Sequence, residues 1–126
     1  MGILGRGRTG GGCGVGLVEQ RVEVLSDQRG VRVIICSGEF DQGTLGPLRA
    51  AAEAAVGDAA VRWIALDVTG VEFADSTLLN LLLWLLRTGR LVLIGPTPHR
   101  LNRVFDLTQA GDLFRVVDSV EEARLL

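Results

Sequence analysis

A carboxylate followed by two hydroxyls stands in the middle of this sequence. Asp75, Ser76 and Thr77 form a short polar corner between an extended apolar segment and a run of leucines. This layout is typical of a strand, a sharp turn and a helix, so we expect the polar atoms at a helix N-terminus, where backbone N–H groups are free. A phosphate on a hydroxyl at this corner would be attracted by the helix and repelled by Asp75. This combination of attraction and repulsion would suit a site that is switched by phosphorylation.

Two interpretations of Ser76 follow from this position. Serine is a common N-cap, and its hydroxyl would then accept a hydrogen bond from the helix backbone. Ser76 could also be a phosphoacceptor, and the two roles are compatible because a capping serine can be phosphorylated. Asp75 could instead be the N-cap, with Thr77 in the first turn. We expect Asp41 and Asp67 at strand ends near the same pole of the sheet, for ligand binding or for simple turn chemistry.

Other chemistries find little support in the residues. The single histidine, His99, has no cysteine or carboxylate partner at a metal-binding spacing, so we expect no metal and no cofactor. A small α/β hydrolase that uses Ser76 and His99 is the enzyme alternative, but the chain lacks a G-x-S-x-G elbow. The glycine motif at residues 12–16 does not follow a strand, which argues against dinucleotide binding. The residues thus give an enzyme only weak support.

Length and charge narrow the function classes further. The chain has 126 residues, which suits one domain around one core, and its formal net charge is −2. With no overall basic field, we expect no direct nucleic-acid partner and no membrane partner. The apolar run Leu78–Leu86 is too short for a bilayer span of about 20 residues. Cys13 and Cys36 lie in very different contexts, so we expect no disulfide and a cytoplasmic location.

The corner must be positioned by a regular alternation of elements. Residues 1–17 are glycine-rich and predict a flexible tail, and residues 18–126 predict one domain. Nearly all-apolar strands that alternate with helices predict an α/β fold, with a mixed, largely parallel sheet of four to five strands covered by about four helices. The expected strands are Val18–Leu25, Val31–Cys36, Val61–Val68, Leu91–Ile94 and Phe114–Val117. The expected helix starts are Thr44 or Asp41, the corner itself, Thr97 as N-cap before Pro98, and a capping box at Ser119–Glu122.

The leucine run after the corner makes a prediction of its own. A helix that is apolar around its whole circumference is either buried on all sides or meets a partner. Because a sheet covers only one face of a helix, we expect some of these leucines to be exposed, which favours a partner surface or a homodimer through this helix. The leucines concerned are Leu78, Leu79, Leu82, Leu85 and Leu86.

Several motifs in a fixed order resemble the STAS domain of bacterial anti-sigma factor antagonists. The resemblance covers about Val18–Leu126. The motifs are Gly38-Glu39-Phe40-Asp41 with Thr44, Asp67–Val71, Phe73–Thr77, Leu91–Pro96, and Phe105–Thr108 followed by Leu113-Phe114.

The resemblance implies a regulatory binding module with no catalytic activity of its own, so we expect a protein that is not an enzyme. In that family an anti-sigma factor with serine kinase activity phosphorylates the serine that matches Ser76. The unphosphorylated form binds the anti-sigma factor and frees a sigma factor, so transcription is regulated indirectly, and the phosphorylated form does not bind. The family usually has glycine where this chain has Leu78, which we expect to place a bulky group beside the partner surface. A STAS-like scaffolding domain that is never phosphorylated is the alternative. The partner-binding residues implied are Asp41, Asp75, Thr77, Leu78 and Leu79.

Overall fold

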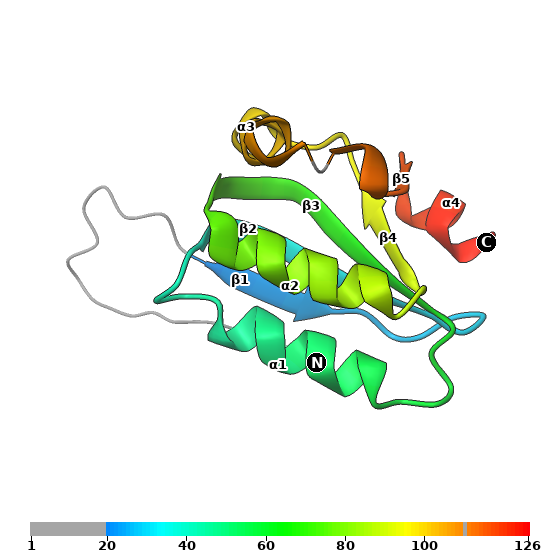
Figure 1. The fold of residues 1–126 in the computed structure, drawn as a ribbon. Helices are drawn as coiled ribbons and strands as arrows, with labels where there is room; N and C mark the ends of the chain where they lie inside the picture. Colours follow the sequence, from blue (N-terminus) through cyan, green and yellow to red (C-terminus); the bar gives the residue numbers. More distant parts are fainter. Residues whose placement is uncertain (1–19, 110) are drawn as a thin grey trace.

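The computed structural model describes residues 20–109 and 111–126, so the predicted tail at residues 1–17 lies outside the described part. Ten elements follow one another along the described chain (Figure 1). They are β1 (Arg21–Val24), β2 (Val31–Phe40), α1 (Gly46–Val56), β3 (Trp63–Ala74), α2 (Ser76–Arg87), β4 (Leu91–Ile94), α3 (His99–Thr108), the short 3-10 helix η2 (Gly111–Leu113), β5 (Val116–Val117) and α4 (Val120–Arg124).

The five strands form a single mixed sheet in the order β1-β2-β3-β4-β5. β1 pairs with β2 in antiparallel fashion, and the remaining neighbours are parallel, which confirms the predicted α/β fold. β2 and β3 run further than the sequence predicted, because their pairing continues through polar residues as far as Phe40 opposite Ala74. Gly70 permits this continuation, since a Cβ there would lie 2.8 Å from the Cβ of Ser37.

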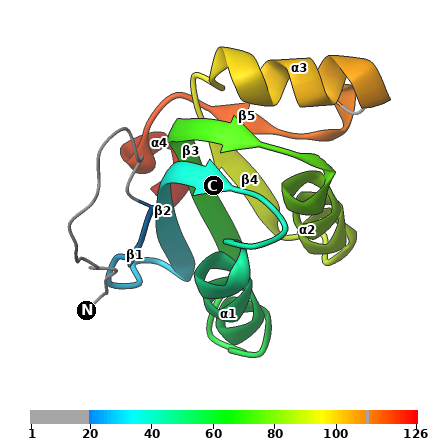
Figure 2. The same cartoon turned by 90° about the vertical axis from the view of Figure 1, so that its left-hand side faces the viewer.

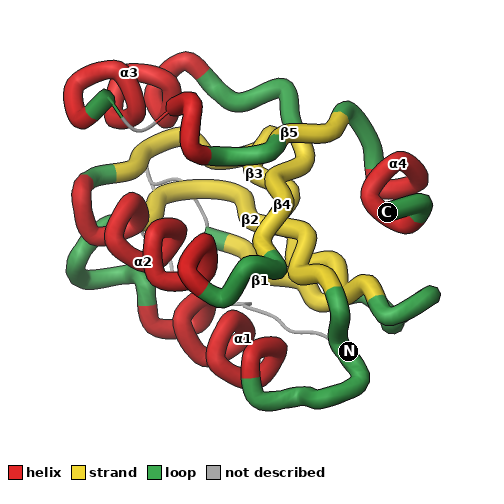
Figure 3. Tube along the Cα trace, turned by 45° about the vertical axis from the view of Figure 1, so that its right-hand side comes forward, coloured by secondary structure: helices red, strands yellow, loops and turns green. Residues whose placement is uncertain are grey.

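Helices cover both faces of the sheet. α1 and α2 lie on one face, and α4 lies on the other (Figure 3). α3 belongs to the side of α1 and α2, because Leu101 and Phe105 pack into the same hydrophobic core. Phe105 stacks on Phe114 with ring centroids 5.0 Å apart, which holds α3 against the chain that leads into β5. A smaller core beneath α4 is made by Val31, Val33, Ala65, Val92, Ile94, Val117 and Ala123.

The leucine run is largely buried, so the prediction that some of its leucines are exposed was wrong. α2 contacts β3 and β4 beneath it and also α1 and α3 beside it. The two neighbouring helices cover the flanks that a sheet alone leaves open, and Leu86 stays only partly buried. The exposed residues of α2 share one side of the helix, which we call the outer face of α2. It consists of Ser76, Asn80, Trp84 and Arg87.

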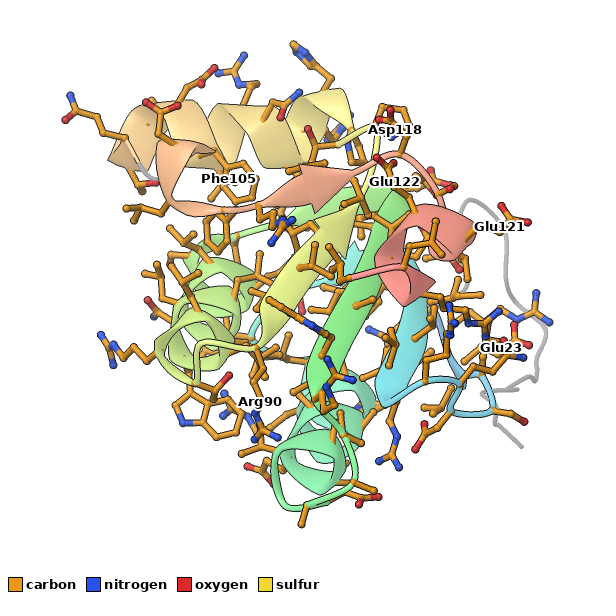
Figure 4. All side chains as sticks on the ribbon, turned by 90° about the vertical axis from the view of Figure 1, so that its right-hand side faces the viewer. Glu23, Arg90, Phe105, Asp118, Glu121 and Glu122 are labelled. Carbon is orange, nitrogen blue, oxygen red and sulfur yellow. The ribbon has the colours of Figure 1, made fainter. Side chains whose placement is uncertain are left out.

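Two predicted helix starts can be compared with the observed caps. α3 begins after Pro98 and has no capping side chain. Pro98, with an extended backbone, occupies the N-cap position, so Thr97 is not the N-cap. α4 begins as predicted, and the Ser119 hydroxyl accepts a hydrogen bond from the Glu122 N–H at 3.0 Å. The Glu122 carboxylate accepts a hydrogen bond from the N–H of Asp118 at 2.7 Å (Figure 4). In a standard capping box, the donor would be the N–H of the N-cap residue, Ser119.

Candidate functional site

The strand register brings two carboxylate-bearing turns to one end of the sheet. Phe40 at the end of β2 lies opposite Ala74 at the end of β3. Asp41 and Asp75 are the next residues of the two neighbouring parallel strands, so the turns that they begin lie beside each other. Figure 2 looks at this end, where β2 and β3 lead into the starts of α1 and α2. We call the two turns together the switch end of the sheet.

Asp67 does not belong to the switch end, contrary to the sequence prediction. It pairs with Ile35 and Ile94 in the middle of the sheet, because β3 continues well beyond it. Its carboxylate accepts hydrogen bonds from the N–H and the hydroxyl of Thr69, at 3.0 Å and 2.7 Å. Asp67 therefore makes the local hydrogen bonds typical of an aspartate in a turn.

Asp75, and not Ser76, caps α2. The backbone of Asp75 is extended, with φ −127° and ψ −169°, and its Oδ1 accepts a hydrogen bond from the Thr77 N–H at 2.8 Å. Ser76 is the first residue of the helix, and its side chain is exposed. Within the described residues the structure gives the Ser76 hydroxyl no hydrogen bond. This hydroxyl is thus not engaged in capping and faces solvent at a fixed point of the helix.

Three backbone donors in the first turn of α2 are already engaged. The Thr77 N–H bonds the Asp75 carboxylate, and the N–H groups of Leu78 and Leu79 approach the Asp75 carbonyl at 3.1 Å and 3.3 Å. A charge on Ser76 would therefore find the N–H groups of Thr77, Leu78 and Leu79 already engaged, with a carboxylate beside it. This differs from the sequence argument, which assumed free N–H groups at this corner, because the side chain of Asp75 uses the position that an anion would take.

Asp41 is held within a compact loop. Its Oδ1 accepts from the Gly43 N–H at 2.9 Å and from the Thr44 hydroxyl at 3.0 Å, and its own N–H donates to that hydroxyl at 2.9 Å. Neither Asp41 nor Thr44 caps α1, which begins after Leu45 without a capping side chain. Thr44 closes the loop instead, and this fixes Asp41 beside the corner that carries Ser76.

Two of the predicted contact residues are withdrawn from the surface. Leu78 and Leu79 are 1% and 4% exposed, and Thr77 is half-buried. The prediction that Leu78 places a bulky side chain beside the partner surface was wrong. Leu78 faces the core, on the side of α2 opposite Ser76. The exposed residues of α2 that follow Ser76 are Asn80 and Trp84, at intervals of four along the helix, and then Arg87. Asn80, the polar break in the leucine run, was the signal for this face.

The groups with perturbed ionisation lie away from the switch end. The pKa of Asp58 lies below its ordinary value. The main cause is a hydrogen bond from the Ala60 N–H, and the ion pair with Arg32 at 2.7 Å lowers the pKa further. The carboxylates of Asp27 and Asp58 raise the pKa of Arg32 against the opposing effect of burial. Burial raises the pKa of the Cys36 thiol. These shifts belong to structural ion pairs and to the core.

The described residues offer no support for a hydrolase or a metal centre. Within residues 20–109 and 111–126, no hydrogen bond joins Ser76 to His99, which is itself exposed on the first turn of α3. No group of three or more His, Cys, Asp or Glu in that part of the chain could hold a metal ion. None of the described helices combines the length and the apolar character needed to cross a membrane.

Comparisons with known proteins agree with this geometry. The family model described as "Mlab, STAS domain" matches residues 24–117. No curated protein matches the chain in sequence. Among solved structures, an anti-sigma factor antagonist from Mycobacterium paratuberculosis is 28% identical with a TM-score of 0.64, and the match covers 84% of this chain and 90% of that one.

Two further structures show the same fold in two states. The anti-sigma factor antagonist SpoIIAA in its unphosphorylated form is 26% identical, with a TM-score of 0.61 over 82% of this chain and 94% of that one. The Bacillus cell fate determinant SpoIIAA in the phosphorylated form is 27% identical, with a TM-score of 0.61 over 81% and 95%. The fold is thus that of anti-sigma factor antagonists, and the chain belongs to the STAS domain family.

Proposed function

We propose that this domain is an anti-sigma factor antagonist that binds an anti-sigma factor with serine kinase activity and is released when Ser76 is phosphorylated. Its contact face consists of Asp41, Asp75, half-buried Thr77 and the outer face of α2. The buried Leu78 and Leu79 support this face from beneath. The domain performs no catalysis itself and acts on transcription only through its partner.

The observation that carries the proposal is the exposed hydroxyl of Ser76 on the first residue of α2. Asp75 supplies the cap, so the Ser76 hydroxyl can be modified without the loss of a helix-capping bond. A modifying enzyme needs such an accessible hydroxyl at a fixed position. The similarity to an antagonist solved in both unphosphorylated and phosphorylated forms supports the same role.

Phosphorylation would act by local charge. A phosphate adds a charge of about −1.5 to −2 at neutral pH. At Ser76 it would lie beside the Asp75 carboxylate and near Asp41, where the N–H groups of Thr77, Leu78 and Leu79 are already engaged. In the free domain, water solvates this charge. In a complex the charge would be buried without a partner, which costs several kcal/mol, and each 1.4 kcal/mol is about tenfold in affinity.

Partner capture with a set of serine and threonine variants tests the proposal. The chain is used to retain its cognate anti-sigma factor from native lysate, and the retained protein is identified by its kinase activity. Ser76→Asp is expected to lose the partner and to keep the melting curve of the wild type. Ser76→Ala is expected to keep the partner and to resist phosphorylation. Ser26→Asp is the matched control, since Ser26 is exposed in the turn at the far end of β1 and carries the same added charge.

A second candidate has one observation in its favour. The matching family model is described as "Mlab, STAS domain", a description that names no anti-sigma factor. A STAS-like scaffolding domain would bind its partner through the same face without phosphorylation. Equal partner capture by Ser76→Asp and wild type would favour this scaffold, because the added charge would then lie outside the interface.

A further inference from the structure

The first described residue of the chain reaches across to the switch end. The Gln20 side chain donates from its Nε2 to the Glu39 carbonyl at 2.7 Å and to the Thr44 carbonyl at 2.6 Å. Glu39 lies at the end of β2, and Thr44 lies just before α1. One amide group therefore ties together the two ends of the loop that carries Asp41.

The orientation of this amide is fixed by its partners. Both partner atoms are carbonyl oxygens, which only accept hydrogen bonds, so the NH₂ group of Gln20 and not its oxygen must face them. Both N–H bonds of the group are used. A glutamate at this position has the same length but only acceptors at neutral pH, and a methionine has similar length without a donor.

The loop itself depends on a few short bonds. Asp41, Gly43 and Thr44 hold one another through the carboxylate, the hydroxyl and three backbone N–H groups. These bonds set the shape of the loop, but all of them lie within it. The Thr44 hydroxyl also bonds the Glu39 carbonyl at 3.0 Å, which ties the loop to β2. The bonds from Gln20 come from outside the loop, from the residue just before β1, and they attach both ends of the loop to the β1 side of the sheet.

We propose that Gln20 is a positioning residue for the contact face. Its amide fixes the loop Asp41–Thr44 in the place where Asp41 lies beside Ser76, and partner affinity depends on it although Gln20 need not touch the partner. The dependence of affinity rests on the proposed function, whereas the placement of the loop does not. No sequence pattern indicated this role, because residue 20 precedes the first motif of the resemblance.

Hydrogen–deuterium exchange in the free domain tests the placement. The reporters are the amides of Gly43 and Thr44, which both bond Asp41. In Gln20→Met we expect these two amides to exchange about tenfold faster, as for the loss of one or two hydrogen bonds, with unchanged exchange elsewhere in the sheet. Gln28→Met, in the turn at the other end of β2, is the control. Unchanged loop exchange in Gln20→Met, or an equal rise throughout the domain, would overturn the proposal.

A double-mutant cycle on partner affinity tests whether Gln20 acts through Asp41. The probe is the purified cognate anti-sigma factor kinase. Gln20→Met is expected to weaken binding about fivefold in the wild-type background and less than about twofold in an Asp41→Asn background. Equal losses in both backgrounds would overturn action through Asp41. If the wild-type chain does not bind this kinase at all, the proposed function fails, and loop exchange alone then decides the role of Gln20.

Discussion

Replacement of Asp75 tests the assignment of the helix cap and of the engaged donors. Asp75→Ala removes the acceptor of the 2.8 Å bond from the Thr77 N–H and also the negative charge at the helix N-terminus. Loss of an N-cap costs about 1 kcal/mol, and loss of the charge near the helix dipole costs a further 0.3–1 kcal/mol, roughly. Asp75→Asn keeps an acceptor oxygen and loses only the charge. We therefore expect a loss of about 1.5 kcal/mol for Asp75→Ala and about 0.5 kcal/mol for Asp75→Asn.

Urea unfolding measures both losses. With a slope of about 1.5 kcal/mol per molar urea, Asp75→Ala should lower the midpoint by about 1 M at an unchanged slope. Asp75→Asn should lie between the alanine variant and the wild type. If Asp75→Ala unfolded at the wild-type midpoint, or if Asp75→Asn lost as much as alanine, the capping bond would not stabilise α2 as the structure implies.

The same geometry predicts a coupling between residues 75 and 76. In the wild type, the carboxylate introduced by Ser76→Asp finds the Thr77 N–H already engaged and a like charge beside it. In the Asp75→Ala background that donor is released and the like charge is gone, so Ser76→Asp should stabilise the domain relative to Asp75→Ala alone. The same effect of Ser76→Asp in both backgrounds would show that engagement of the Thr77 N–H by Asp75 does not affect a charge at residue 76.

Three other predictions concern the framework. Leu82→Ala should destabilise the domain by about 2–5 kcal/mol in denaturant unfolding, whereas the exposed Asn80→Ala should cost under about 0.5 kcal/mol. Arg90 donates to the carbonyls at the end of α1 and before β3 at 2.9 Å and 2.8 Å, so Arg90→Met should cost about 2 kcal/mol by the same assay (Figure 4). The pKa of Asp58 is lower in the folded than in the unfolded state, so the ionised carboxylate stabilises the fold at pH values above the unfolded pKa. This stability is lost as the pH falls through the folded pKa. Asp58→Asn should therefore weaken the dependence of the unfolding free energy on pH below about pH 4.

Much of the fold could be predicted from apolar periodicity. The strands Val31–Cys36 and Leu91–Ile94 and the helix after Asp75 are long or apolar enough to stand out, and their order implied the mixed sheet. Strand ends were harder, because β2 and β3 continue through polar residues that only the pairing of the two strands explains. The burial of the leucine run could not be predicted, since it depends on α1 and α3 lying against α2 in space.

The site was only partly predictable for the same reason. The motif order pointed to Ser76 and Asp41, and the structure places their turns on neighbouring strand ends. Local sequence could not decide between Asp75 and Ser76 as the cap, because either side chain can accept the bond. The reach of Gln20 to the loop joins residues far apart in the chain, and no pattern of spacing indicates it.

Phosphosite mapping is the most direct test of whether phosphorylation of Ser76 releases the partner. The wild-type chain and Thr77→Ala are incubated with the purified cognate kinase and ATP, and modified peptides are identified by mass spectrometry. We expect a single phosphate on Ser76 in both proteins and, in the same samples, loss of the complex with the kinase. Phosphate on Thr77 alone, or no phosphate on a chain that still binds the kinase, would contradict the account.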